Sequence, residues 1–63
     1  MEVNMKNFEY AIVPVPLPGP IEDIVNDWAY HGWRLKQVTP TVDFTPIGPV
    51  DVDLLYFERQ VFV

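Results

Sequence analysis

The chain has 63 residues, of which nine are acidic, four are basic and none is cysteine, and its net charge is −5. A domain this short buries only about 60% of its unfolded surface. Because disulfides are excluded, we expect a homo-oligomer to supply the missing stability, although a hydrophobic content of 49% leaves a monomer open. The negative charge disfavours binding to nucleic acid or anionic membranes and favours a partner protein with a basic surface.

The N-terminus lacks the basic and then apolar pattern of a signal peptide, and no apolar run approaches the roughly 20 residues that cross a bilayer. We therefore expect a cytoplasmic protein without membrane contact. Residues 1–6 are mostly polar and predict a loose N-terminal tail in front of the first ordered element.

A first strand is predicted for residues 8–13, where the side chains alternate between two faces. Prolines follow at every second position from Pro14 to Pro20. In an extended chain the missing amide hydrogens of Pro14 and Pro16 lie on one side, which indicates a blocked edge strand followed by a stiff connector. A proline-rich docking segment is the weaker alternative, because the spacing gives no P-x-x-P motif.

A helix is predicted for residues 20–30, because proline suits the first helical position and apolar residues recur at helical spacing. The predicted apolar stripe consists of Ile21, Ile24, Val25 and Trp28. The opposite face carries Asp23, Asn26, Asp27 and Tyr30. Gly32 lies just past the last periodic residue, where a glycine can close a helix in the left-handed conformation.

The second strand is predicted to begin at Trp33 and to end at Pro40, with Arg34 and Lys36 facing outward. Residues 40–49 contain three prolines and a glycine and predict a long proline-rich loop, with a short extended piece as an option at residues 42–45. A third strand is predicted for residues 50–63. It is apolar on both faces, which is typical of a central strand.

These elements predict a single small β-α-β-β domain of the α+β class. We expect a three-stranded sheet of order 1-3-2, in which strand 3 is central and antiparallel and one helix packs on one face. The other face would stay apolar and uncovered. Two alternatives for it are left open: back-to-back packing of two copies, or cover by the long loop and the tail.

Three short motifs lie along most of the chain: Phe-Glu-Tyr at 8–10, Gly-Trp-Arg-Leu at 32–35 and Tyr-Phe-Glu-Arg at 56–59. In these motifs the chain resembles a family of short uncharacterised bacterial and phage proteins, which have an "EY" strand, a helix ending in a "GWEL" motif and a final "YxFxR"-like strand. Arg34 departs from the family, which commonly has an acidic residue there. The resemblance supports the fold, transfers no site, and implies a phage or mobile-element origin.

The residues give no sign of catalysis, and we expect neither an enzyme nor a bound cofactor or metal. Serine and cysteine nucleophiles do not occur in the sequence, and His31 is the only histidine. Asp43, Asp51 and Asp53 would hold a hard cation only if the 40–49 loop folded back, and their spacing fits no known calcium loop. Solvated surface charge is the simpler interpretation of these three aspartates.

The sequence therefore predicts a small, acidic, non-enzymatic protein-interaction module, for example a phage-type inhibitor or regulator that binds a larger host protein. The residues expected to contact that partner are Asp23, Asp27, Tyr30, His31, Arg34 and Phe44. A first alternative is an oligomeric binder or sponge for a small anionic ligand such as a nucleotide, held by Arg34, Lys36 and Arg59. A second alternative is a structural subunit of a larger assembly.

Overall fold

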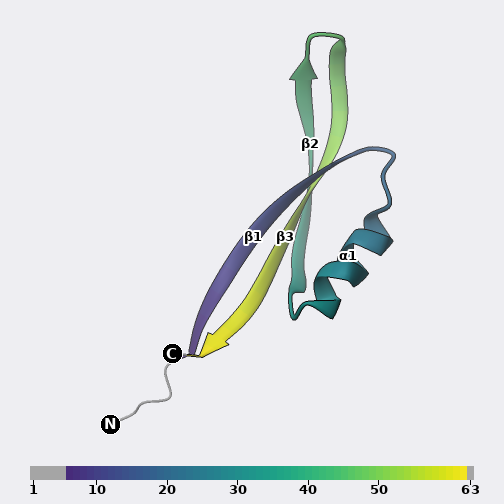
Figure 1. Ribbon diagram of the computed structural model, residues 1–63. Helices are drawn as coiled ribbons and strands as arrows, with labels where there is room; N and C mark the ends of the chain where they lie inside the picture. Colours follow the sequence, from purple (N-terminus) through teal and green to yellow (C-terminus); the bar gives the residue numbers. More distant parts are fainter. Residues whose placement is uncertain (1–5, 63) are drawn as a thin grey trace.

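Three antiparallel strands and one helix make up the computed structural model, which describes residues 6–62 (Figure 1). The elements are β1 (Lys6–Pro16), α1 (Ile21–Tyr30), β2 (Arg34–Thr45) and β3 (Gly48–Phe62). β3 lies between β1 and β2 and is antiparallel to both. The predicted order 1-3-2 and the α+β class are confirmed. The predicted tail lies outside the described residues apart from Lys6, which begins β1.

The core lies between α1 and one face of the sheet. Val15 of β1 and Leu55 and Phe57 of β3 are its buried residues, and the predicted apolar stripe of α1 packs against them. Trp28 stacks on Phe57 with 4.7 Å between the ring centroids. Because Phe57 and Leu55 are fully buried, each contributes about 1.5–3 kcal/mol of hydrophobic stabilisation relative to an exposed position.

The helix ends at Tyr30 and is closed by Gly32, as the sequence predicts. The Gly32 amide donates to the Ala29 carbonyl oxygen at 3.0 Å, and the Trp33 amide donates to the Trp28 carbonyl oxygen at 3.1 Å. These two bonds form a Schellman motif, which requires the left-handed backbone that Gly32 adopts at a φ of +91°. The motif turns the chain sharply, so Trp33 lands beside Trp28 and β2 begins at Arg34.

The segment 40–49 is not a loop, and this part of the sequence prediction is wrong. β2 continues to Thr45, a two-residue turn at Pro46 and Ile47 follows, and β3 begins at Gly48. Pro40 is compatible with an edge strand because its nitrogen faces away from β3. At the turn the Thr45 hydroxyl donates to the Gly48 carbonyl oxygen at 2.7 Å, and Gly48 has a φ of +123° that favours glycine.

The tip of this β2–β3 hairpin projects beyond β1 as an arm, here defined as residues 42–51 (Figure 1). The arm gives the chain its elongated shape, with a longest dimension of 56 Å and a shortest of 15 Å. On the face of the sheet opposite α1, no element packs among the described residues. We call this surface the open face. Residues 40–49 do not cover it as a loop, because they belong to β2, the turn and β3, and back-to-back packing of two copies stays a prediction.

Candidate functional site

A shallow hollow lies where the C-terminal end of α1 meets the sheet. It encloses about 410 Å³ and is lined by Asp27, Trp28, His31, Trp33 and Arg59. The Schellman turn builds it, because reversing the chain at Gly32 brings residues from both sides of the turn against the helix. We call this hollow the corner site.

The walls of the corner site are held in place by aromatic packing. Trp33 meets Trp28 edge to face, with ring centroids 5.3 Å apart, and Trp28 is itself stacked on the buried Phe57. The Arg59 guanidinium lies 4.6 Å from the Trp33 ring centroid and is paired with Glu9 of β1. These contacts fix the two indoles and the guanidinium, so the hollow is preorganised.

The rim of the corner site is polar. His31 Nδ1 lies 2.9 Å from the Asp27 backbone oxygen, and a carbonyl can only accept, so Nδ1 carries a hydrogen. In the neutral ring Nε2 is then a free acceptor. The Asp27 carboxylate has no ion-pair partner among the described residues. Beside the rim, the exposed Tyr30 ring packs edge to face on His31.

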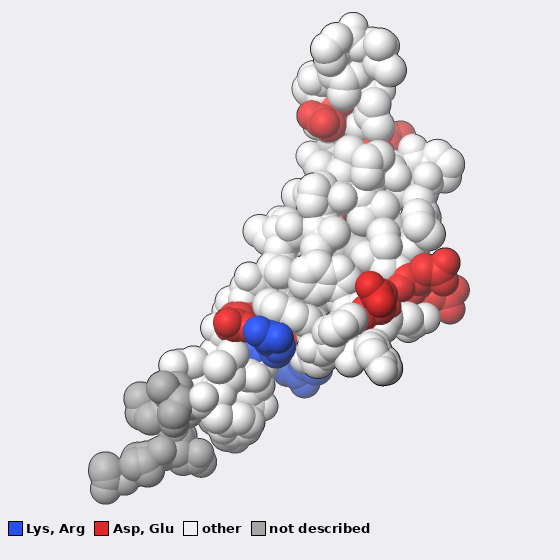
Figure 2. All heavy atoms as spheres, in the orientation of Figure 1, with Lys and Arg blue, Asp and Glu red and all other residues white. Residues whose placement is uncertain are grey.

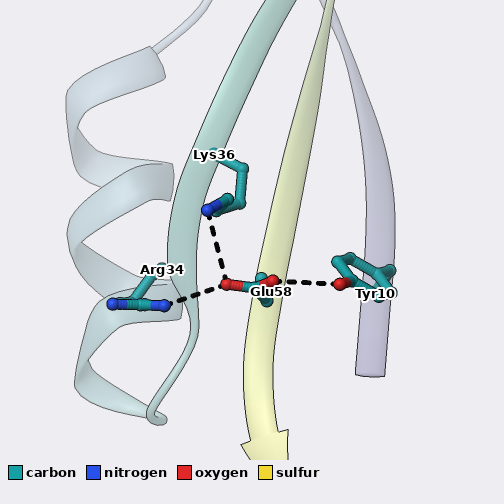
Figure 3. Close-up of polar contacts among 4 residues, drawn as sticks. All are labelled: Tyr10, Arg34, Lys36 and Glu58. Atoms are coloured by element: carbon teal, nitrogen blue, oxygen red, sulfur yellow. Dashed lines mark hydrogen bonds and ion pairs between the residues drawn. The ribbon is translucent and has the colours of Figure 1, made fainter. Parts of the chain in front are cut away.

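A separate polar cluster lies on the open face and is centred on Glu58 of β3 (Figure 3). The Tyr10 hydroxyl donates to Glu58 Oε2 at 3.0 Å, Arg34 Nη2 donates to Glu58 Oε1 at 2.9 Å, and Lys36 Nζ lies 3.6 Å from the same oxygen. These side chains cover the carboxylate, so Glu58 is only 7% exposed although no element covers this face.

The cluster shifts the titration of two of its members. Burial opposes ionisation of Glu58, but hydrogen bonds from Arg34 and Tyr10, with the nearby cationic charges, outweigh it and lower the pKa of the carboxyl. The hydrogen bond to Glu58, with smaller effects of burial and of the carboxylate charge, raises the pKa of Tyr10. Glu58 is therefore an ionised structural anchor that fixes the side chains on the open face.

Of the three residues in the anion-binding alternative, one chain brings only Arg34 and Lys36 together. That alternative places the anion at a subunit interface, so it stays a prediction. Arg34 and Lys36 lie on the open face and are paired with Glu58. Arg59 follows Glu58 in β3 and therefore points to the opposite face, where it is paired with Glu9. Alternation along β3 therefore separates Arg59 from the other two cations, and the three cations pair with two carboxylates, Glu58 and Glu9.

The six residues predicted to contact a partner do not form one surface. Asp27 and His31 lie together at the corner site with Tyr30 beside them, and Asp23 lies one helical turn before Asp27. Arg34 lies on the open face, and Phe44 is exposed near the tip of the arm, far from the C-terminal end of α1 (Figure 1). Four of the six therefore remain a candidate contact surface.

Sequence reasoning missed the two tryptophans and Glu58 as site residues. Trp28 was assigned only to the apolar stripe and Trp33 only to the start of the second strand, although both also line the hollow. Glu58 sits on a central strand, and its partners Tyr10 and Arg34 are its register neighbours on either side. The signal for Glu58 was the strand register, which required the position of the turn at Pro46 and Ile47.

The surplus negative charge is carried by α1, by the arm and by Asp53, which lies in β3 just beyond the arm. Figure 2 shows acidic side chains over the arm and the helix, with the basic side chains gathered farther toward the other end. The described carboxylates without an ion-pair partner are Glu22, Asp23, Asp27, Asp43, Asp51 and Asp53. The corner site therefore lies beside an acidic surface.

A metal site is not found within residues 6–62, where no group of three or more potential ligands converges. The register explains why the aspartates of the arm stay apart: Asp51 pairs with Val42, so Asp43 faces the other side of the hairpin. In the same range no helix is long and apolar enough to span a bilayer, since α1 has ten residues.

Comparison of the chain with known protein families, curated proteins and solved structures gave no match. The resemblance to a family of short bacterial and phage proteins therefore stays a prediction.

Proposed function

We propose that this protein is a non-enzymatic protein-interaction module that binds a larger protein with a basic surface through the corner site and the acidic side of α1. The observation that carries the proposal is a preorganised aromatic hollow with the Asp27 carboxylate at its rim, which has no ion-pair partner within residues 6–62. An arginine or lysine of the partner would place its aliphatic stem against Trp28 and Trp33 and its charge beside Asp27.

The residue types at this corner support a binding role. Tryptophan and tyrosine are enriched among residues that dominate protein interfaces, because they bury a large area with little loss of conformational freedom. Tyr30 is 86% exposed, and its ring gains nothing from the core of this chain. We propose that Tyr30 packs on the partner next to the inserted basic side chain.

The charge distribution supports the choice of a basic partner. Asp23 and Asp27 share one side of α1, and Glu22 lies in the same helix, all without ion-pair partners in the described chain. Such a surface accelerates the approach of a positively charged protein and repels acidic competitors. By covering a basic site on a larger protein, the module would inhibit or regulate that protein.

The proposal is tested by titrating the protein with a short arginine-rich peptide at low salt and measuring the dissociation constant by calorimetry. We expect binding, and we expect Asp27→Asn to weaken it about fivefold. Asp43→Asn removes the same charge from the arm and should weaken binding less than twofold, because the arm lies far from the corner site and makes no direct contact with a peptide bound there. Equal losses in both variants would show attraction by net charge alone and would overturn the assignment to the corner site.

A further inference from the structure

The direction of the backbone groups in β1 determines which of them are free. The Leu17 amide donates to the Asp51 carbonyl oxygen at 2.8 Å, directly after the last register pair of β1 with β3. In an antiparallel ladder, successive residues of a strand direct their backbone groups to opposite sides. The odd-numbered residues of β1 therefore bond to β3, and the even-numbered ones turn their N–H and C=O groups toward the outer edge.

Prolines occupy outward-facing positions on every exposed edge of the sheet in the described chain. The same register turns the nitrogens of Pro14 and Pro16 to the outer edge of β1, that of Pro40 to the outer edge of β2, and that of Pro49 away from β2 in the arm. A proline at such a position removes the amide that a further strand would bond. These four residues protect most of the edges against pairing.

The longest unblocked stretch is the first half of β1. Phe8, Tyr10 and Ile12 present consecutive outward amides, whereas beyond Pro40 the outer edge of β2 offers only Val42 and Phe44 before the turn. The three β1 side chains are 44%, 67% and 58% exposed and none is charged. Edges that must stay free normally carry charges or prolines. We call residues 8–12 the β1 window: its three outward-facing positions carry neither, and the charge of Glu9 between them is paired with Arg59.

We propose that the β1 window pairs with the same window of a second copy, antiparallel and centred on Tyr10. Phe8 then faces Ile12 of the second copy, and Tyr10 faces Tyr10, so all three outward amides are bonded. A centre at Glu9 would set two carboxylates directly opposite each other, and a centre at Ala11 would set Phe8 against Pro14, which has no amide. The residues of the window therefore select one register.

This pairing joins two three-stranded sheets into one continuous sheet with both helices on the same face. Aromatic and aliphatic side chains pair across the junction, which is the kind of contact that stabilises antiparallel strands. None of the residues that line the corner site lies in β1, so the pairing uses no residue of that site. The dimer is therefore independent of the proposed partner binding.

Single cysteines test the register, because the chain has no cysteine of its own. Residues facing each other in a hydrogen-bonded pair have Cα atoms about 5.5 Å apart, within the range of a disulfide. Tyr10→Cys should form a covalent dimer on oxidation. Phe8→Cys and Ile12→Cys should not cross-link alone, since each lies about 14 Å from its own copy, but should cross-link when mixed. Another cross-linking pattern would overturn the proposal.

The contribution of the outward-facing Ile12 amide to dimer formation can be tested by measuring the molar mass in solution by sedimentation equilibrium. The buffer should contain 0.3 M salt, which screens the repulsion between two acidic chains. The wild-type protein should show a concentration-dependent dimer. Ile12→Pro, which removes this amide in both copies, should raise the dissociation constant about 30-fold. Ile12→Thr keeps the amide and should change it far less. A wild-type mass that stays monomeric at every concentration, or equal effects of both substitutions, would overturn the proposal.

Discussion

Tyr10 of β1 and Glu58 of β3 are 48 positions apart in the chain, and the phenol oxygen donates a 3.0 Å hydrogen bond to the carboxylate. The bond connects neighbouring strands across the open face, next to the ion pairs that Glu58 makes with Arg34 and Lys36 of β2. One carboxylate thus connects all three strands. Its ionised state is part of the folded structure, and this has consequences for the dependence of stability on pH.

The first prediction concerns acid. The folded-state pKa of Glu58 is lowered from its ordinary value of 4.5, so its contribution to stability is complete above that pH and is lost as the pH falls through the folded pKa. Urea denaturation followed by tryptophan fluorescence should show a falling free energy of unfolding below about pH 4.5. Glu58→Gln should be less stable at pH 7 and should lose less on acidification. An unchanged acid response would contradict the role of Glu58, and Glu22→Gln serves as the exposed control.

The second prediction concerns alkali. The pKa of Tyr10 is raised from its ordinary value of 10.0, so the stabilisation is complete below that pH and is lost as the pH rises through the folded pKa. Tyr10→Phe should abolish this alkaline loss, as measured by the same denaturation experiments above pH 9. Tyr30→Phe removes a hydroxyl from an exposed ring and should leave the wild-type response intact. An identical effect of both variants would argue against the Tyr10–Glu58 bond.

The third prediction concerns the core. Phe57 is fully buried under Trp28, so Phe57→Ala removes both its hydrophobic burial and the aromatic stack. We expect a loss of about 3–5 kcal/mol in the free energy of unfolding. Ile47→Ala at the exposed turn should change it by less than about 0.5 kcal/mol. If chemical denaturation showed similar losses in unfolding free energy for Phe57→Ala and Ile47→Ala, the face of the sheet that packs against α1 would be assigned incorrectly.

The fourth prediction concerns the turn that builds the corner site. Gly32 has a φ of +91°, and a Cβ at this position meets nothing closer than an Arg59 side-chain carbon at 3.8 Å. The cost of Gly32→Ala is therefore backbone strain rather than a clash, about 1–2 kcal/mol in the free energy of unfolding. Gly32→Asn should cost less, because asparagine tolerates the left-handed region better. Should alanine prove neutral in thermal and urea unfolding, the Schellman assignment would fail.

The fifth prediction concerns the protected edge of β2. Pro40→Val restores an outward amide and joins Val38, Val42 and Phe44 into a longer open edge. We expect association beyond a dimer, measured by multi-angle light scattering. Thr41→Val adds a similar apolar side chain at a residue whose amide faces β3, and it should keep the wild-type mass. Association of both variants would show that surface hydrophobicity, and not the freed amide, is responsible.

The elements that follow from local pattern were predictable from the sequence. The apolar spacing of α1, the glycine that closes it and the two-sided apolar character of β3 are properties of short segments. Together these patterns predicted the helix, the helix-closing glycine at position 32 and the central position of β3, and the structure contains all three. Asp23, Asp27 and Tyr30 were predicted to be exposed because they lie opposite the apolar stripe, and all three are exposed in the structure.

The arm and the Glu58 cluster were not predictable in the same way. The three prolines between Pro40 and Pro49 resemble those of a loop, and only the register shows that two of them lie on free edges of a hairpin. The same register, with its irregularity between Leu35 and Gln37, decides which cations face Glu58 and sends Arg59 to the other face. These side-chain positions depend on which residues of distant strands pair, and they cannot be read from any short segment alone.

The most direct test of partner binding at the corner site is a nitrogen–proton correlation spectrum recorded while an arginine-rich peptide is added. The chain contains two tryptophans, so its two indole signals report on the walls of the hollow. We predict that both indole signals and the backbone amide signals of Asp27 and His31 shift as peptide is added. All four signals should give the same dissociation constant. Shifts confined to the arm or the open face, or no shifts at saturating peptide, would contradict the proposed function.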